Sequence, residues 1–227
     1  MRRRGFLASV LALAALAAWS PAHAAEDDAE VLLEQARVTL LELQADEQIM
    51  PTVSLYVQNA YGVLIVPSQF KLGFIVGGSY GRGVLLTRDV ATGAWSEPAV
   101  YDLYGGSVGL QIGGQSSSAI YTIMNKEALD KLLASTSFKM GADASAAIGT
   151  AGAGVGAGTT PNFGEDIYLF AKTKGLFGGL AVDGTVITPM PSWNKALYGR
   201  DVTVQEIMQG SVVNMTSDPL KQALNQF

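Results

Sequence analysis

Residues 172–188 read KTKGLFGGLAVDGTVIT, and this glycine-punctuated stretch decides the fold class of the chain. A lysine-bearing segment runs into the glycines, and a β-branched run, residues 185–188, follows them. The glycines are Gly175, Gly178, Gly179 and Gly184. Because β-branched residues favour strands and an Asp-Gly step favours a tight turn, the stretch predicts a β-hairpin.

A similar pattern occurs about a hundred residues earlier, in GFIVGGSYGRGVLL at residues 73–86. Gly77 and Gly78 align there with the later glycine pair, and YGGSVGLQIGG at residues 104–114 is a third variant. Two or three related copies suggest one antiparallel unit that is reused, with structural glycines in its turns. Neither copy has the glycine spacing of a phosphate-binding loop that opens a helix, which argues against a nucleotide site.

The first 24 residues have the pattern of a cleaved export signal. Three arginines precede an apolar run from Phe6 to Trp19, and Ala22-His23-Ala24 has the small-x-small pattern of a cleavage site. We therefore expect cleavage after Ala24 and a mature domain at residues 25–227. Arg3-Arg4-Gly5-Phe6-Leu7 also fits a twin-arginine signal, so both the twin-arginine and the Sec route stay open.

Charge and composition exclude several classes of function. Cleavage removes three of the 15 basic residues and none of the 20 acidic ones, so the formal net charge changes from −5 to −8. The mature chain also lacks histidine and cysteine, which excludes Ser-His-Asp and Cys-His catalysis and the commonest metal ligands. An acidic chain without a basic run is a poor partner for nucleic acid. We expect no cofactor, no metal and no enzymatic activity.

A helix is predicted for about residues 27–47, since apolar side chains recur on one arc of a helical wheel. These side chains are Ala29, Leu32, Leu33, Ala36, Leu40 and Leu43. The charges around the arc are mainly acidic, so packing against a core is favoured over insertion into lipid.

A β-rich core is predicted for about residues 61–190, with a short helix at 126–134 that Asn125 caps. The expected strands lie at about 61–66, 72–79, 82–88, 98–112, 117–124 and 165–174. Short helices are expected within residues 193–225. The fold class is therefore α+β, with a mainly antiparallel, glycine-rich sheet or barrel-like core.

Residues 137–158, SFKMGADASAAIGTAGAGVGAG, fit three structures. A strand is favoured for 138–148, with a loop or short strand for 150–160. The GxxxG spacings also fit a packed helix, and the glycine-alanine content fits a flexible linker.

Several of these motifs together resemble the SYLF domain, a family of lipid-associated modules. The matching segments are GFIVGGSYGRGVLL (73–86), WSEP (95–98), VGLQIGG (108–114), FKMGADASAAIG (138–149), KTKGLFGGLAVDGTVI (172–187) and ALYG (196–199). The resemblance covers roughly residues 30–210 and implies binding of membrane phospholipids and, in some eukaryotic members, of actin. The N-terminal helix is acidic here, whereas eukaryotic members are thought to use a basic one, and an exported bacterial chain is an unlikely actin partner.

We therefore predict a non-enzymatic phospholipid-binding protein of the bacterial cell envelope, either periplasmic or peripheral on a membrane. Its expected ligand-binding residues are basic side chains beside aromatic ones on strands: Lys172, Lys174, Tyr168, Phe170, Arg82, Lys139 and Lys71. Lysine suits phosphate as a compact point charge. The alternative is a structural or assembly protein of the envelope, in which the glycine-rich faces receive a protein partner or a second copy of the chain.

Overall fold

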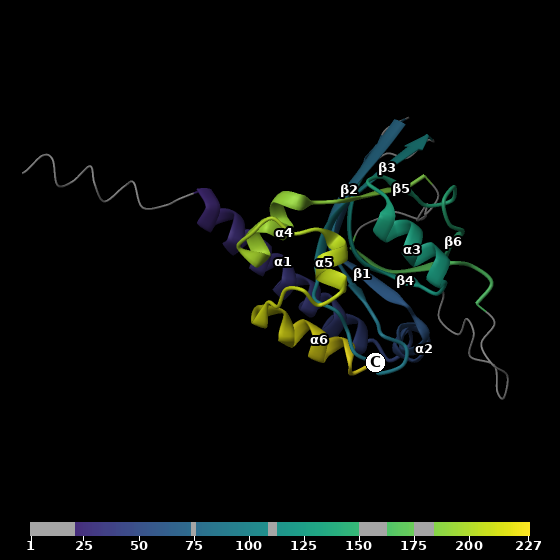
Figure 1. Ribbon diagram of the computed structural model, residues 1–227. Helices are drawn as coiled ribbons and strands as arrows, with labels where there is room; N and C mark the ends of the chain where they lie inside the picture. Colours follow the sequence, from purple (N-terminus) through teal and green to yellow (C-terminus); the bar gives the residue numbers. More distant parts are fainter. Residues whose placement is uncertain (1–20, 74–75, 109–112, 150–162, 175–183) are drawn as a thin grey trace, which may run out of the picture.

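The computed structural model (Figure 1) describes residues 21–73, 76–108, 113–149, 163–174 and 184–227. An eight-stranded, mostly antiparallel sheet curls into a half-barrel, in the order β5-β8-β3-β2-β1-β4-β7-β6. Helices from the two ends of the chain pack around it. This confirms the predicted α+β class with a β-rich core.

Four long strands form the centre of the sheet. They are β1 (Gly62–Gly73), β2 (Val76–Thr87), β3 (Ala99–Val108) and β4 (Gly113–Ile123). The first predicted strand, at about residues 61–66, is too short, because β1 continues past Pro67 through a register shift between Ile65 and Ser68. Proline has no N–H to donate to the ladder, and the register shift allows β1 to contain a proline without losing its pairing on either side.

The predicted hairpin at residues 172–188 is also wrong. β7 (Ile167–Lys174) pairs with β4, whereas β8 (Val186–Pro189) pairs with β3, so four strands separate them in the sheet. Each of them pairs with an outer strand of the central four, β8 with β3 and β7 with β4, and eight residue pairs join β7 to β4. The chain does turn at Gly184, where φ is +80°. This turn does not close a hairpin, because Gly184 and Thr185 form main-chain hydrogen bonds with Met140.

The segment from Phe138 to Ile148 joins the two edges of the sheet. β5 (Phe138–Lys139) pairs with β8 at one edge, and β6 (Ala146–Ile148) pairs with β7 at the other. The single strand predicted here is replaced by two short ones, because the chain turns at Gly141, where φ is +86°. Residues 150–162 lie outside the described part of the chain, as do Gly175, Gly178 and Gly179.

One face of the sheet, which we call the outer face, is covered by helices from both ends of the chain. These are α1 (Pro21–Gln44), α2 (Met50–Asn59) and α6 (Asp218–Leu224). All six side chains of the predicted arc of α1 are buried, which confirms the wheel. The helix begins at Pro21 rather than near residue 27 and ends at Gln44 rather than near 47.

The opposite, inner face packs against α3 (Lys126–Ala134) and α5 (Val204–Met208). The predicted cap of α3 is confirmed, since the Asn125 side chain accepts a hydrogen bond from the Glu127 N–H. The remaining short helices are α4 (Pro191–Tyr198), which Gly199 ends in a left-handed conformation, and the 3-10 turn η1 (Met215–Ser217).

Candidate functional site

The helices leave one end of the central strands β2 and β3 uncovered (Figure 1). Three aromatic side chains of the central strands are exposed on the outer face. The register places Tyr104 of β3 opposite Tyr80 of β2, and Tyr80 opposite Phe70 of β1. Their exposed fractions are 47% for Tyr104, 39% for Tyr80 and 56% for Phe70. We call these three residues the aromatic row. Neighbouring exposed rings of this kind mark an interaction surface more often than scattered apolar residues do.

The aromatic row continues across the sheet with polar side chains. Phe70 lies opposite Ser116 of β4, and Ser116 lies opposite Lys174 of β7. Lys172 lies opposite Ser118 in the same pair of strands. Because side chains alternate along a strand, Lys172 and Lys174 belong to the same face of β7. The Lys172 side chain is exposed, and its Nζ lies 3.5 Å from the main-chain oxygen of Glu42 in α1.

A buried carboxylate anchors the row to the sheet. Asp102 of β3, only 2% exposed, accepts two hydrogen bonds from Arg82 of β2, at 2.6 Å from Nε and 3.0 Å from Nη2. Tyr80 and Tyr104 donate their hydroxyls to the same carboxylate, at 3.2 and 3.1 Å. The Arg82 guanidinium also stacks on the Trp193 ring of α4, 4.0 Å from its centroid. A carboxylate with these four donors is well compensated for its burial.

These surroundings also raise the pKa of Arg82, Tyr80 and Tyr104. The hydrogen bond to Asp102 raises the pKa of Arg82. Burial and then the charge of Asp102 raise the pKa of Tyr80, while burial and the hydrogen bond to Asp102 raise that of Tyr104. Both phenols therefore stay neutral at ordinary pH.

The structure separates several residues that the sequence analysis grouped. Arg82 is committed to Asp102, and β1 and β4 lie between its strand and that of Lys172. Lys139 is on β5, at the opposite edge of the sheet order from β7 and β6. Lys71 of β1 lies opposite Gln115 of β4. Lys174 of β7 lies opposite Ser116 of the same strand β4.

Phe170 is fully buried in the core beneath α2, where its ring meets Tyr56 edge-on at 5.1 Å. It is therefore a core residue, which corrects its expected place in a surface site. Tyr168 is half-buried and also packs on Tyr56, at 4.6 Å. Strand periodicity places Phe170 on one face with Lys172, but it cannot say where a helix stops covering that face.

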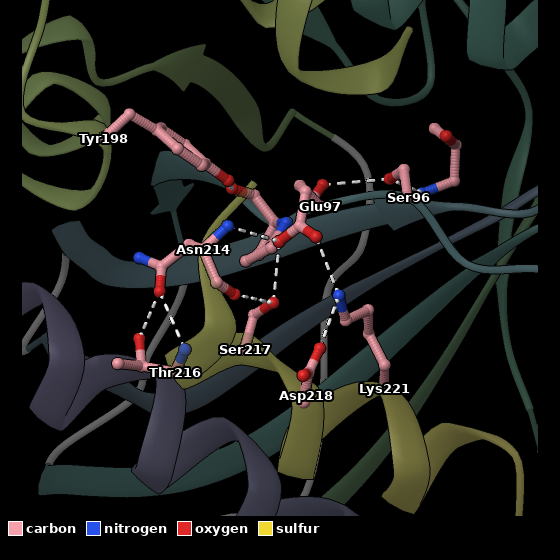
Figure 2. Close-up of polar contacts among 10 residues, drawn as sticks. Ser96, Glu97, Tyr198, Asn214, Thr216, Ser217, Asp218 and Lys221 are labelled. Atoms are coloured by element: carbon pink, nitrogen blue, oxygen red, sulfur yellow. Dashed lines mark hydrogen bonds and ion pairs between the residues drawn. The ribbon is translucent and has the colours of Figure 1, made fainter. Parts of the chain in front are cut away.

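A second polar cluster joins the C-terminal helices to the connection between β2 and β3 (Figure 2). Both oxygens of the buried Glu97 are engaged: Lys221 Nζ lies 2.7 Å from Oε1, and Ser217 Oγ donates to Oε2 at 2.7 Å. Burial alone would lower the pKa of Lys221, but its bonds to Glu97 and Asp218 outweigh burial and raise it. The Tyr198 hydroxyl donates to the main-chain oxygen of Pro98 at 2.6 Å. Glu97 thus has a structural role that the WSEP motif alone did not disclose.

Within the described residues, no group of three or more His, Cys, Asp or Glu side chains is arranged to hold a metal ion. None of the helices in the described segments combines the length and the apolar character that crossing a membrane requires.

Comparison with known proteins assigns the chain to a family. Residues 104–227 match the family model described as Ysc84, Las17-binding protein actin regulator. Over 81% of its length the chain is 32% identical to the SH3 domain-containing protein PJ696.02 of Schizosaccharomyces pombe, and covers 42% of that protein. It is 28% identical to Protein YSC84 of Saccharomyces cerevisiae over 79% of its length, covering 38% of that relative.

A mammalian relative, the SH3 domain-containing YSC84-like protein 1 of Rattus norvegicus, is 24% identical over 89% of the chain. The chain covers 58% of that protein, so it spans between about two fifths and three fifths of these three relatives. The family is described by binding and regulation, which is consistent with a non-enzymatic binding role. By the match of its C-terminal half and by its identity to the fission-yeast protein, this chain belongs to the Ysc84, or SYLF, domain family.

Proposed function

We propose that this chain binds phospholipid bilayers as a non-enzymatic protein of a bacterial cell envelope. The observation that carries the proposal is the aromatic row, which presents three rings on one face beyond the reach of the covering helices. Tyrosine favours the boundary between water and lipid because its ring is apolar and its hydroxyl is polar. Here the two phenols keep their hydroxyls on Asp102 while their rings face outward.

The lysines of β7 fit a supporting role in the same surface. Lys172 is exposed, and Lys174 lies one row further along the same face, opposite Ser116. A chain whose mature net charge is near −8 is repelled by an anionic bilayer at long range, so a local cationic group helps only close to the surface. Insertion of the rings is therefore expected to supply most of the affinity.

The proposed location rests on the N-terminal sequence. The arginines, the apolar run and the small-x-small pattern of residues 1–24 support export and cleavage after Ala24. N-terminal sequencing of the exported protein tests this step, and a retained Met1 would contradict cleavage. Replacement of Arg3 and Arg4 by lysine distinguishes the twin-arginine route, which it blocks, from the Sec route.

Vesicle co-sedimentation with the Phe70→Ser variant tests the proposal. Phe70 is half exposed, so removing its ring from the lipid contact should cost about 1.4 kcal/mol, or about tenfold in binding. Val90→Ser is the matched control, because Val90 is 61% exposed but lies on the β2–β3 connection, at the other end of β2. Equal binding by wild type and Phe70→Ser, or no binding of wild type to any vesicle, would contradict the proposal.

A salt series separates the two contributions to binding. Attachment through the rings should persist as salt rises, because the hydrophobic effect is not screened. Attachment through the lysines should weaken steeply and should fall in the Lys172→Glu, Lys174→Glu double variant. Binding that vanishes at high salt would make the lysines, and not the aromatic row, the main contact.

A protein partner is the second candidate, and a hollow at the other end of the sheet favours it. The hollow has a volume of about 630 Å³, is lined by Trp95 and Met208, and has the exposed Val90 and Val213 at its surface. Such a hollow suits an apolar side chain of another protein. If Val213→Lys abolished a partner complex that Phe70→Ser left intact, this reading would take precedence.

A further inference from the structure

A groove runs between α1 and the uncovered part of the sheet, beside the aromatic row. Its volume is about 290 Å³, and Val38 and Glu42 of α1 form one wall. Pro67 and Ser68 of β1, with Ser116 and Ser118 of β4, are on the opposite side. Ser116 lies directly opposite Phe70 in the register, so the groove adjoins the aromatic row.

Hydroxyl groups gather in this groove for a reason that the strands supply. Ser116 and Ser118 alternate with inward residues and share the outer face with the buried Ile120. Ser68 follows the register shift of β1, and its Oγ lies 3.4 Å from Oγ of Ser116. Each hydroxyl can donate one hydrogen bond and accept others, so the group suits a ligand with oxygen atoms.

Two charges of opposite sign flank the hydroxyls. Both carboxylate oxygens of the neighbouring Glu34 are held by Arg37, at 2.6 and 2.8 Å. Among the described residues Glu42 has no ion pair, and neither has Lys172, whose Nζ rests near the main-chain oxygen of Glu42 and not on its carboxylate. Glu42 therefore lines the groove without an ion-pair partner among the described residues. The Lys172 ammonium lies at its border, since Lys172 is opposite the groove residue Ser118 in the register and rests on the Glu42 main chain.

We propose that this groove binds the phosphoethanolamine head group of a zwitterionic phospholipid. Lys172 and the serine hydroxyls would hold the phosphate, and Glu42 would accept hydrogen bonds from the ammonium group. A choline head group has no N–H to donate, and a glycerol head group has no cation for Glu42. The inference rests on the proposed membrane binding, because it names the lipid that the same surface selects.

The position of the groove fits a lipid that lies across the aromatic row. A head group held at Ser116 and Ser118 would leave the glycerol and the start of the acyl chains beside Phe70. The rings would then hold the protein at the bilayer, while the groove would distinguish one head group from another. Affinity and selectivity thus come from neighbouring but different residues, which makes them separable by substitution.

The test measures binding of the full chain to phosphatidylcholine vesicles that contain an equal fraction of either phosphatidylethanolamine or phosphatidylglycerol. We expect severalfold tighter binding to the ethanolamine vesicles, roughly the gain of one charge-assisted hydrogen bond. Glu42→Gln should abolish this preference. Glu47→Gln, which makes the same charge change outside the groove, should keep it.

The variants Lys172→Gln and Ser118→Ala should also lower the preference. Lys126→Gln serves as the control for Lys172→Gln, since Lys126 is an exposed lysine on α3 that is paired with Asp130. Thermal melting checks that each variant folds. A Glu42→Gln variant that keeps the full preference for ethanolamine would overturn the assignment.

A second measurement separates failure of the groove from failure of membrane binding. Titration of the chain with soluble glycerophosphoethanolamine, followed by amide chemical shifts, should give saturable shifts at Ser116 and Ser118, and glycerophosphocholine should not. Equal binding to all vesicles without such shifts would overturn the groove and leave the proposed membrane function. Saturable shifts without any vesicle binding would overturn the membrane function and leave the head-group site.

Discussion

Phe170 and Phe70 lie on the same face of one sheet, yet Phe170 is fully buried and Phe70 is 56% exposed. Around Phe170 the outer face is closed by α2 and α1, and the side chains there form a continuous core with Ile65 and Val84. Around Phe70 no described helix covers the face, and the strands are held by their ladders and by the Arg82–Asp102 network. The difference shows that the extent of the covering helices, and not the strand pattern, divides this face. The covered half stabilises the fold, and the uncovered half is available for binding.

The largest effect expected along these strands is at a glycine of β2 that packs closely on β1. A Cβ on Gly83 would lie 2.4 Å from the main-chain oxygen of Ile65, whereas a Cβ on Gly78 meets nothing nearer than 4.0 Å. Gly83→Val should therefore cost about 5 kcal/mol or prevent folding, since the backbone of a central strand must move. Gly78→Val should stay within about 1 kcal/mol. Urea unfolding measures both, and similar losses at the two positions would contradict the close packing of β2 on β1 at Gly83.

The paired phenylalanines give the next largest effect. Phe170→Ala should lower the free energy of unfolding by about 3–5 kcal/mol, because it leaves a cavity among Tyr56 and its neighbours. Phe70→Ala should change it by less than about 0.5 kcal/mol. Chemical denaturation of the two variants decides the matter. A large loss in Phe70→Ala would show that the uncovered half also belongs to the core.

The sequence correctly predicted the features of the fold that depend on residues close together in the chain. The wheel of α1 identified its buried side chains correctly, and the predicted cap at Asn125 is also present. The partners of β7 and β8 could not be predicted, because an Asp-Gly turn is locally the same whether the chain returns on itself or crosses to the far edge.

The uncovered site was harder to predict for a similar reason. Arg82 and Asp102 are twenty residues apart and become neighbours only through the β2–β3 register. Phe70 and Phe170 both sit among alternating strand residues, so burial depends on where the helices end in space. A signal was nevertheless available, since Tyr80, Arg82, Asp102 and Tyr104 follow the two-residue spacing that places each pair on one face.

The boundary between the two halves can be tested at Arg82. Arg82→Met removes the cation that compensates the buried Asp102 and should cost about 2–4 kcal/mol, somewhat less than a fully buried pair because Arg82 keeps some exposure. Adding Asp102→Leu should recover part of this loss, since an apolar pair needs no compensation. The unfolding free energies of the wild type, the two single variants and the double variant form a double-mutant cycle that measures the coupling of Arg82 and Asp102. A double variant that is as unstable as the sum of its single changes would contradict a direct coupling.

Within the Asp102 network the smallest expected effect is at the hydroxyl of Tyr104, and it separates the ring from its hydrogen bond. Tyr104→Phe deletes the donor that bonds Asp102 at 3.1 Å but keeps the ring in the aromatic row. Asp102 retains Arg82 and Tyr80, so the loss in unfolding free energy should be about 0.5–1 kcal/mol. Vesicle binding should stay at the wild-type level, because the proposed contact is made by the ring. Tyr104→Ser should lose the same hydrogen bond and also weaken binding severalfold, so equal binding by the two variants would remove Tyr104 from the membrane contact.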